Sequence, residues 1–172
     1  MAIRSDYVTR ATKFIKQFMP YIENCKTVRQ YENATFKFNN QHKRCVSCQH
    51  GLTRVVFITS DYVVKITTRT DDIFGDCETE REFYEFAISE GKEYLFAPIT
   101  RVEYNNHYYY IMPRINYVDT GKADVDYYLD PEDAYWVNEH LYDMHCGNFG
   151  FNKDKSYPII IDYASVRSYS ED

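Results

Sequence analysis

The spacing of apolar residues predicts three helices. Apolar side chains recur every three or four positions over residues 6–19, which is the period of an amphipathic helix, and Pro20 marks its predicted end. Residues 76–89 show the same period, and Gly91 follows as a typical helix stop. A proline and two acidic residues open the segment 131–141, and these residue types favour the first turn of a helix.

Strands are predicted where β-branched and aromatic residues cluster between turn residues. The expected strand pairs are 52–59 with 62–68, 99–104 with 108–112, and 148–151 with 159–162. Asn105 and Asn106 join the second pair, and asparagine tolerates the left-handed backbone of a tight hairpin turn. The segment 25–44 has no clear period, although the alternation over 34–38 favours a short strand there. Residues 114–130 are expected to form an acidic loop.

Composition limits the class of protein. With 172 residues, of which 44% are hydrophobic and 27% charged, the chain is expected to fold as one globular domain. Its 20 basic and 26 acidic residues give a formal charge of -6, which argues against nucleic acid as a partner. The apolar stretches are too short to span a membrane, and the N-terminus lacks the apolar core of a secretion signal. A cytoplasmic protein is therefore expected.

Five cysteines form an odd set in a chain that is long enough to need no disulfides, so reduced thiols in a cytosol are the simplest interpretation. Four residues also have a spacing that is typical of zinc ligands: His42, Cys45, Cys48 and His50. All four lie within nine positions, whereas structural zinc sites usually draw two ligands from a distant segment. Free thiols at the start of a strand are favoured, and a zinc site is the alternative.

The segment 142–148 carries the clearest chemical signal. Asp143 is followed five residues later by Asn148, and Asp162 closes the predicted hairpin that comes next. An aspartate, an asparagine and a second aspartate at these places would gather three oxygen ligands around one point, as magnesium bound to a nucleotide requires. The spacing therefore predicts a site for Mg²⁺ and a nucleotide.

With its Asp-Met-His-x-Gly-Asn sequence, this segment resembles the protein-kinase-like family, in the form found in aminoglycoside and choline phosphotransferases. It is also similar to the small kinase-like early proteins with which bacteriophages take over host cells. The resemblance implies an α+β fold of two lobes, with an antiparallel sheet in the N-lobe and a truncated C-lobe. The expected parts of this single domain are a helical extension over 1–44, an N-lobe over 45–112 and a C-lobe over 113–172.

The resemblance also assigns residues upstream of the motif, in a fixed order. Gly51 stands at the position of the phosphate-covering loop, which carries a single glycine here. Lys65 lies among β-branched residues in the second strand of the first hairpin, where an ammonium would meet the α- and β-phosphates of ATP. Met112 opens the Met-Pro-Arg segment that would form the hinge beside adenine.

Helix 76–89 offers four candidate partners for Lys65: Glu78, Glu80, Glu82 and Glu85. Glu80 precedes Phe83 and Tyr84 by three and four positions, so it shares the predicted buried face of the helix. Glu82 and Glu85 project to the opposite side. Glu80 is therefore the expected partner, because a buried ammonium without a counter-charge is costly.

The activity that the resemblance implies is phosphoryl transfer from ATP. Asp143 would orient or deprotonate the acceptor hydroxyl, while Asn148 and Asp162 would hold Mg²⁺. Lys65 would steady the phosphates that are not transferred. His145 is expected to order the loop rather than to act as a base.

Two functions stay open at this point. The first is an ATP-dependent Ser/Thr protein kinase of the bacteriophage type, with a host protein as its substrate. The second is a catalytically silent, kinase-like binding module (a pseudokinase) that blocks a host protein through an acidic surface rich in tyrosine, of which the chain has 18. A homodimer would complete the short C-lobe, and the sequence leaves the oligomeric state open.

Overall fold

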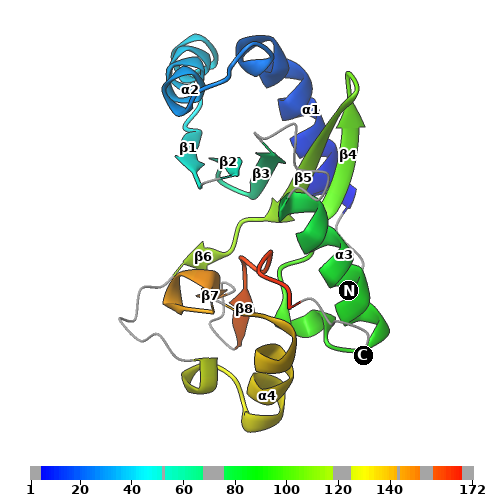
Figure 1. Ribbon diagram of the computed structural model, residues 1–172. Helices are drawn as coiled ribbons and strands as arrows, with labels where there is room; N and C mark the ends of the chain where they lie inside the picture. The colour runs from blue at the N-terminus through cyan, green and yellow to red at the C-terminus, as the bar shows by residue number, and fades with distance from the viewer. Residues whose placement is uncertain are drawn as a thin grey trace. The chain divides into compact units, whose positions relative to one another are not determined.

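The structure, a computed structural model, describes residues 5–51, 53–67, 76–117, 125–142, 144–151 and 157–167. Its helices and antiparallel sheets confirm the predicted α+β class. The chain forms two compact units (Figure 1). The first unit comprises Met1–Glu78 and Pro98–Arg114, and the second comprises Thr79–Ala97 and Ile115–Asp172. None of the described helices is both long and apolar enough to cross a membrane.

The first unit is built on a five-stranded antiparallel sheet with the order β1-β2-β3-β5-β4. Its strands are β1 (Ser47–His50), β2 (Arg54–Ile58), β3 (Tyr62–Thr67), β4 (Thr100–Tyr104) and β5 (His107–Pro113). Both predicted hairpins are confirmed, and Asn105 and Asn106 adopt φ values of 52° and 59°, as their turn requires. Strand β1 escapes the sequence pattern, because this edge strand is mostly exposed and shows no apolar alternation.

Helix α1 (Ser5–Ile22) extends past its predicted end, so the prediction that it stops at Pro20 is wrong. Pro20 removes one hydrogen bond from the helix, but the ladder continues beyond it, where the Glu23 N–H donates to the Met19 carbonyl at 2.9 Å. Ile22 is buried in the core. The burial of this side chain favours the additional turn.

Helix α2 (Val28–His42) replaces the short strand predicted at 34–38, and that prediction is wrong. The signals for a helix are a capping box and a buried stripe. Thr27 accepts a hydrogen bond from the Gln30 N–H, while the Gln30 side chain accepts one from the Thr27 N–H. The buried residues are Tyr31, Ala34, Thr35 and Phe38, which have helical spacing. Phe36, which suggested strand alternation, is 67% exposed.

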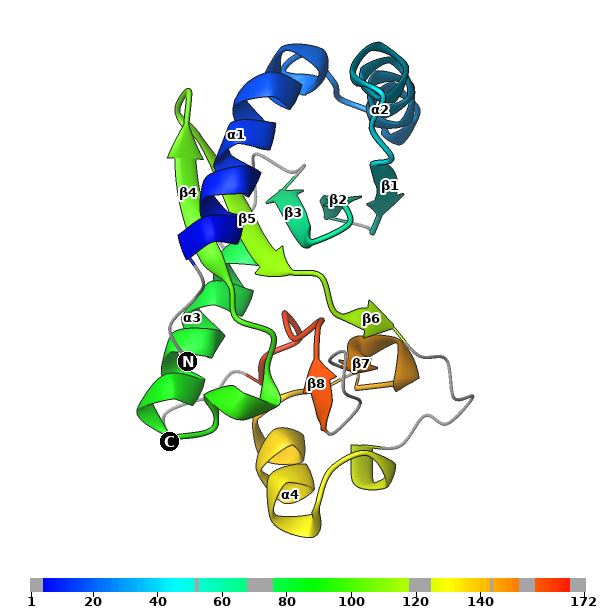
Figure 2. The same cartoon turned by 180° about the vertical axis from the view of Figure 1, so that it is seen from behind.

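One face of the five-stranded sheet forms the core of the first unit. Helix α1 packs against β3, β4 and β5, and α2 packs against β1 (Figure 2). Every second strand residue faces these helices, as a pleated sheet covered on one side requires. The strand residues in this core are Val55, Phe57, Tyr62, Val64, Ile66, Tyr109 and Ile111. Lys65 and Val63 alternate with them along β3 and therefore belong to the opposite face.

The second unit combines helices with a small antiparallel sheet. The elements are α3 (Asp76–Ser89), whose first turn contains the boundary between the units, η1 (Glu93–Leu95), α4 (Pro131–His140), and the strands β6 (Asn116–Tyr117), β7 (Phe149–Phe151) and β8 (Pro158–Ile160). The helices match the prediction, with Asp130 as the N-cap of α4 and Gly91 at a φ of 69° after α3. The hairpin of β7 and β8 is confirmed too, although its predicted turn at 152–155 lies outside the described residues.

The segment predicted as one acidic loop contains more structure than expected. Strand β6 pairs with β7, and a single turn, η2 (Val125–Tyr127), precedes α4. A two-residue strand is too short to leave an alternating pattern in the sequence, so no periodicity announces it.

Candidate functional site

The carboxamide of Asn148 links two segments that the sequence analysis assigned to one site. Its Oδ1 accepts a hydrogen bond from the His145 N–H at 3.0 Å, and its Nδ2 donates to the main-chain carbonyl of Asp162 at 2.9 Å. The hairpin of β7 and β8 explains this approach, since Phe149 pairs with Ile160 and the Ile161 N–H donates to the Asn148 carbonyl at 2.7 Å. The structure therefore brings Asn148 and Asp162 together within the second unit.

The loop before Asn148 is shaped by the imidazole of His145. Its Nδ1 accepts a hydrogen bond from the Gly147 N–H at 3.0 Å, which requires this nitrogen to be unprotonated. A Cβ added to Gly147 would lie 2.7 Å from the His145 ring, so no larger residue fits in this conformation. The geometry agrees with a role of His145 in ordering the loop. Asp143 itself lies outside the described residues.

Glu80 is fully buried in the second unit, with 0% of its surface exposed. Its Oε1 accepts a hydrogen bond from the main-chain N–H of Tyr163 at 3.3 Å. The predicted orientation of the helix is confirmed, because Glu82 and Glu85 are exposed and Glu85 forms an ion pair with Arg81. Glu80 is therefore a buried carboxylate held beside the residue that follows Asp162.

Tyr163 was not singled out by the sequence analysis, yet it anchors this segment. Its side chain is completely buried, its hydroxyl donates to the Ala97 carbonyl at 2.6 Å, and its ring packs on Phe83 and Phe96. Such anchoring fixes the backbone on the C-terminal side of Asp162. The signal in the sequence was a large aromatic residue directly after the aspartate.

Lys65 lies on β3 in the first unit and is buried, with 5% of its surface exposed. Its direct neighbours across the sheet are Val56 on β2 and Tyr110 on β5. Two positions earlier, Val63 pairs with Met112, which is also buried. Residues paired across a sheet share a face, so the ammonium lies on a face that also carries apolar side chains. This combination suits a ligand with a flat apolar part and an anionic part.

Glu78, on the first turn of α3, has partners of its own in the first unit. Its carboxylate accepts hydrogen bonds from Arg101 of β4 at 2.9 Å and from the Tyr110 hydroxyl at 2.6 Å. Burial and the neighbouring Glu78 carboxylate raise the pKa of Tyr110 well above its usual value, so this hydroxyl keeps its proton. Glu78 thus contributes to tying β4 and β5 to the start of α3.

Gly51 occupies the turn between β1 and β2. Its N–H donates to the Arg54 carbonyl at 2.9 Å, and this bond closes the hairpin. A Cβ added to Gly51 would meet only the Arg54 side chain at 3.8 Å, which is an ordinary contact. The position therefore has no steric need for glycine, and its amide is already engaged within the turn.

The predicted site residues fall into two groups. Gly51, Lys65 and Met112 belong to the sheet of the first unit, while Glu80, Asn148 and Asp162 belong to the second. The chain passes between the units after Glu78, after Ala97 and after Arg114, and Arg114 is the last residue of the predicted hinge 112–114.

The described structure does not gather the four residues of the alternative zinc site around one point. Among the described residues, which include all four proposed ligands, no three side chains of a metal-binding type gather closely enough to hold an ion. Cys48 packs against the core, Cys45 is exposed, and neither forms a disulfide. His42 is held by α1, since its Nε2 lies 3.1 Å from the Tyr21 hydroxyl.

Comparison with known proteins leaves the family open. No family model and no curated protein match the chain. The chain is similar to a solved structure described as a co-crystal structure of WbdD and the kinase inhibitor LY294002, with 17% identity and a TM-score of 0.37. The similarity covers 72% of this chain and 34% of that one, so the chain spans about a third of the length of its structural neighbour.

Proposed function

We propose that the protein is a kinase-like phosphotransferase that uses ATP and Mg²⁺, with a protein as the acceptor. The observation that carries this proposal is the pair of hydrogen bonds of the Asn148 carboxamide, which accepts from the His145 N–H and donates to the Asp162 carbonyl. Together they place the end of the Asp-Met-His-x-Gly-Asn segment beside the second aspartate. The phosphotransferase motif requires this juxtaposition of distant residues.

The donor set of the second unit fits magnesium. Mg²⁺ prefers carboxylate and amide oxygens, and a carbonyl oxygen such as Oδ1 of Asn148 has a second lone pair beyond the one that His145 uses. Asn148 and Asp162 would hold the ion, which would neutralise charge on the phosphates of ATP. Asp143 would accept the proton of the acceptor hydroxyl.

The order of elements in the first unit agrees with this assignment. Lys65 stands on the third strand, and the next helix, α3, brings Glu80 in a buried position, which is the sequence of parts found in kinases. Lys65 would bind the phosphates that are not transferred, and Val63 and Met112 on the same face would contact adenine. The resemblance of the segment 142–148 to the kinase-like early proteins of bacteriophages is the reason to propose a host protein as the acceptor.

Calorimetry with Mg²⁺-ATP tests the nucleotide site. Asp162→Asn should weaken binding at least tenfold, because it removes the charge that holds the ion while keeping the side-chain shape. Asp126→Asn, at an exposed aspartate of the same unit, is the matched control and should bind as the wild type does. Equal affinities for the Asp162 variant and the control would contradict the assignment of Asp162.

Transfer of the γ-phosphate tests the activity separately. Wild-type protein should label itself or a host protein from γ-labelled ATP, and Asp143→Ala should abolish labelling without abolishing ATP binding. Labelling that survives this substitution would remove Asp143 from the mechanism.

The silent binding module is the second candidate, and the turn at Gly51 favours it. A kinase covers the phosphates with amides of a glycine-rich loop, whereas the Gly51 N–H here closes its own hairpin. If this candidate is right, millimolar Mg²⁺-ATP produces no heat of binding, and Asp143→Ala captures the host protein as well as the wild type does. Loss of capture in a folded Asp143 variant would count against it.

A further inference from the structure

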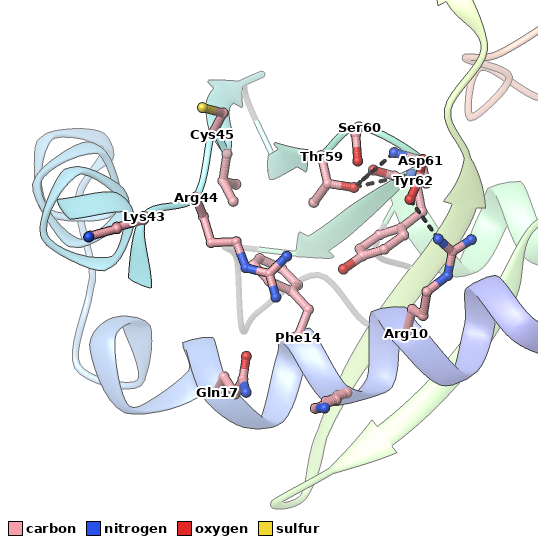
Figure 3. A pocket seen from close by; sticks show the side chains of 12 residues that line it. Arg10, Phe14, Gln17, Lys43, Arg44, Cys45, Thr59, Ser60, Asp61 and Tyr62 are labelled. Atoms are coloured by element: carbon pink, nitrogen blue, oxygen red, sulfur yellow. Dashed lines mark hydrogen bonds and ion pairs between the residues drawn. The ribbon is translucent and has the colours of Figure 1, made fainter. Parts of the chain in front are cut away.

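A pocket of about 430 Å³ lies in the first unit, and none of the candidate site residues lines it (Figure 3). It is enclosed by α1, the segment 43–46 that follows α2, and the turn 59–62 between β2 and β3. Tyr62 lines it and faces the core helices, whereas Lys65, three residues later on β3, belongs to the opposite face of the sheet. A molecule in this pocket would therefore not occupy the face that carries Lys65.

The lining is basic, although the chain as a whole has a formal charge of -6. Arg10, Lys13 and Arg44 contribute cations, and Asp61 contributes the one carboxylate of the lining. Arg10 forms an ion pair with Asp61 at 2.8 Å, which offsets one of the three charges. Within the described parts of the chain, no carboxylate lies at ion-pair distance from Lys13 or Arg44. The pocket therefore keeps an excess of positive charge.

Hydrogen-bond donors stand among these cations. In Figure 3, Arg44 extends toward Phe14 of α1, with the amide of Gln17 and the hydroxyl of Tyr62 on either side. Burial raises the pKa of Tyr62, while Arg44 and Arg10 act in the opposite direction, so the positive charge of both guanidinium groups is felt inside the pocket. Lys43 also lines the pocket, but its side chain points away from the others in Figure 3.

We propose that this pocket binds the phosphate group of an organic phosphate monoester. A guanidinium presents parallel N–H donors that match two phosphate oxygens, and Arg44 lines this pocket together with the ammonium of Lys13. The volume lies within the range of about 300–1,000 Å³ that is typical of small-molecule sites, and Phe14 offers an apolar wall for the organic part. The proposal is independent of the phosphotransferase activity.

Nuclear magnetic resonance of ¹⁵N-labelled protein tests it, with phenyl phosphate as the probe. Titration should shift the amide signals of residues 59–62, and Arg44→Gln should weaken binding by about tenfold, the effect of losing one charged hydrogen bond. Arg44→Lys keeps the positive charge but loses the parallel N–H donors of the guanidinium. The affinity of this variant for phenyl phosphate should therefore lie between those of the wild type and Arg44→Gln. Arg29→Gln, at an exposed arginine of α2 outside the pocket, is the matched control.

Two further probes decide the outcome. Benzyl alcohol should produce no shift, and inorganic phosphate should bind more weakly than the ester; equal binding of both phosphates would overturn the assignment to a monoester. The absence of pocket shifts at about 10 mM phenyl phosphate, or unchanged affinity in Arg44→Gln, would overturn the site altogether. Saturating Mg²⁺-ATP should leave the phenyl phosphate affinity unchanged, which separates this site from the proposed nucleotide site.

Discussion

The two units of the molecule are stabilised by different means. In the first, Phe14, Phe18 and Phe38 pack with ring centroids 4.9–5.6 Å apart, and the sheet residues beneath them are apolar. In the second, aromatic packing is joined by a buried polar cluster around Asp133, whose side chain is 3% exposed. Its carboxylate binds Lys92 at 2.8 Å, the Tyr94 hydroxyl at 2.6 Å and the Tyr157 hydroxyl at 2.8 Å.

This difference shows where each unit tolerates change. An apolar core loses stability in proportion to the volume removed, because neighbouring side chains fill a cavity only in part. The stability of a polar cluster depends instead on every donor keeping its acceptor. A buried polar group without a partner destabilises the fold by more free energy than a satisfied hydrogen bond contributes to it. The first unit should therefore be most sensitive to loss of size, and the second to loss of charge.

The largest effect is expected from Phe18→Ala. Phe18 contacts Phe14, Phe38 and Phe57 and thus joins α1, α2 and β2, so its loss should cost about 3–5 kcal/mol in the free energy of unfolding. Urea unfolding followed by far-ultraviolet circular dichroism measures it. Phe36→Ala is the control, because Phe36 is 67% exposed and should change little. Similar losses for both variants would contradict the description of this core.

A smaller effect, about 2 kcal/mol, is expected from Asp133→Asn, which keeps the size of the side chain and removes its charge. The fluorescence of Trp136, the single tryptophan of the chain, reports unfolding of the second unit. Glu132→Gln is the control, since Glu132 is 89% exposed and lies 3.4 Å from the same lysine. If Asp133→Asn lowered the free energy of unfolding as much as Phe18→Ala does, the expected order of the two effects would be wrong.

The dependence on pH sharpens the same prediction. Burial alone would raise the pKa of Asp133, but hydrogen bonds from Lys92, Tyr94 and Tyr157 outweigh it and hold the pKa below its ordinary value. The stabilisation by the Asp133 carboxylate is therefore complete at a pH above its pKa in the unfolded chain, which is about 3.9. It is lost as the pH falls through the lower pKa that Asp133 has in the folded protein. The difference in stability between wild type and Asp133→Asn should shrink in that acidic range. A constant difference down to the lowest pH at which the protein folds would speak against the cluster.

The smallest effect on global stability, about 1 kcal/mol, is expected from Gly147→Ala, which places a Cβ against the imidazole of His145. Hydrogen exchange of the amides at 147 and 148 measures the opening of the loop. Removing the ring in His145→Ala together with Gly147→Ala should relieve the clash but not restore the lost hydrogen bond. If the amides at 147 and 148 exchanged as slowly in Gly147→Ala as in the wild type, the turn would accommodate the Cβ without a loss of stability.

An element of the fold can be predicted from the sequence when the residues that determine it lie close together along the chain. Helix α3 and the turn at Asn105 follow from nearby residues, and both are confirmed. The local signal for helix α2 is the capping box of Thr27 and Gln30, whereas the alternation at 34–38 favours a strand, so the pattern of apolar residues alone predicts the wrong element. Strand β1 depends on pairing with β2, which no short polar segment announces.

The candidate site shows the same limit. The spacing of Asn148 and Asp162 predicted their meeting, because a short hairpin is a local structure. The anchoring of Tyr163 by the Ala97 carbonyl joins residues 66 positions apart, and no pattern in the sequence encodes that contact. The spacing of nearby residues therefore predicts the proposed magnesium ligands, whereas the contact of Tyr163 that anchors the segment after Asp162 depends on the tertiary fold.

The path of the chain through its main sheet has a consequence for biosynthesis. Strand β3 pairs with β5, so Lys65 meets Tyr110 only after a long stretch of intervening chain has left the ribosome. Until then one edge of β3 lacks the strand that pairs with it in the complete sheet. An open edge invites pairing with other nascent chains. The interval between synthesis of β3 and β5 is therefore a time during which this edge of the sheet is open to other chains, and shortening that interval should reduce aggregation during synthesis.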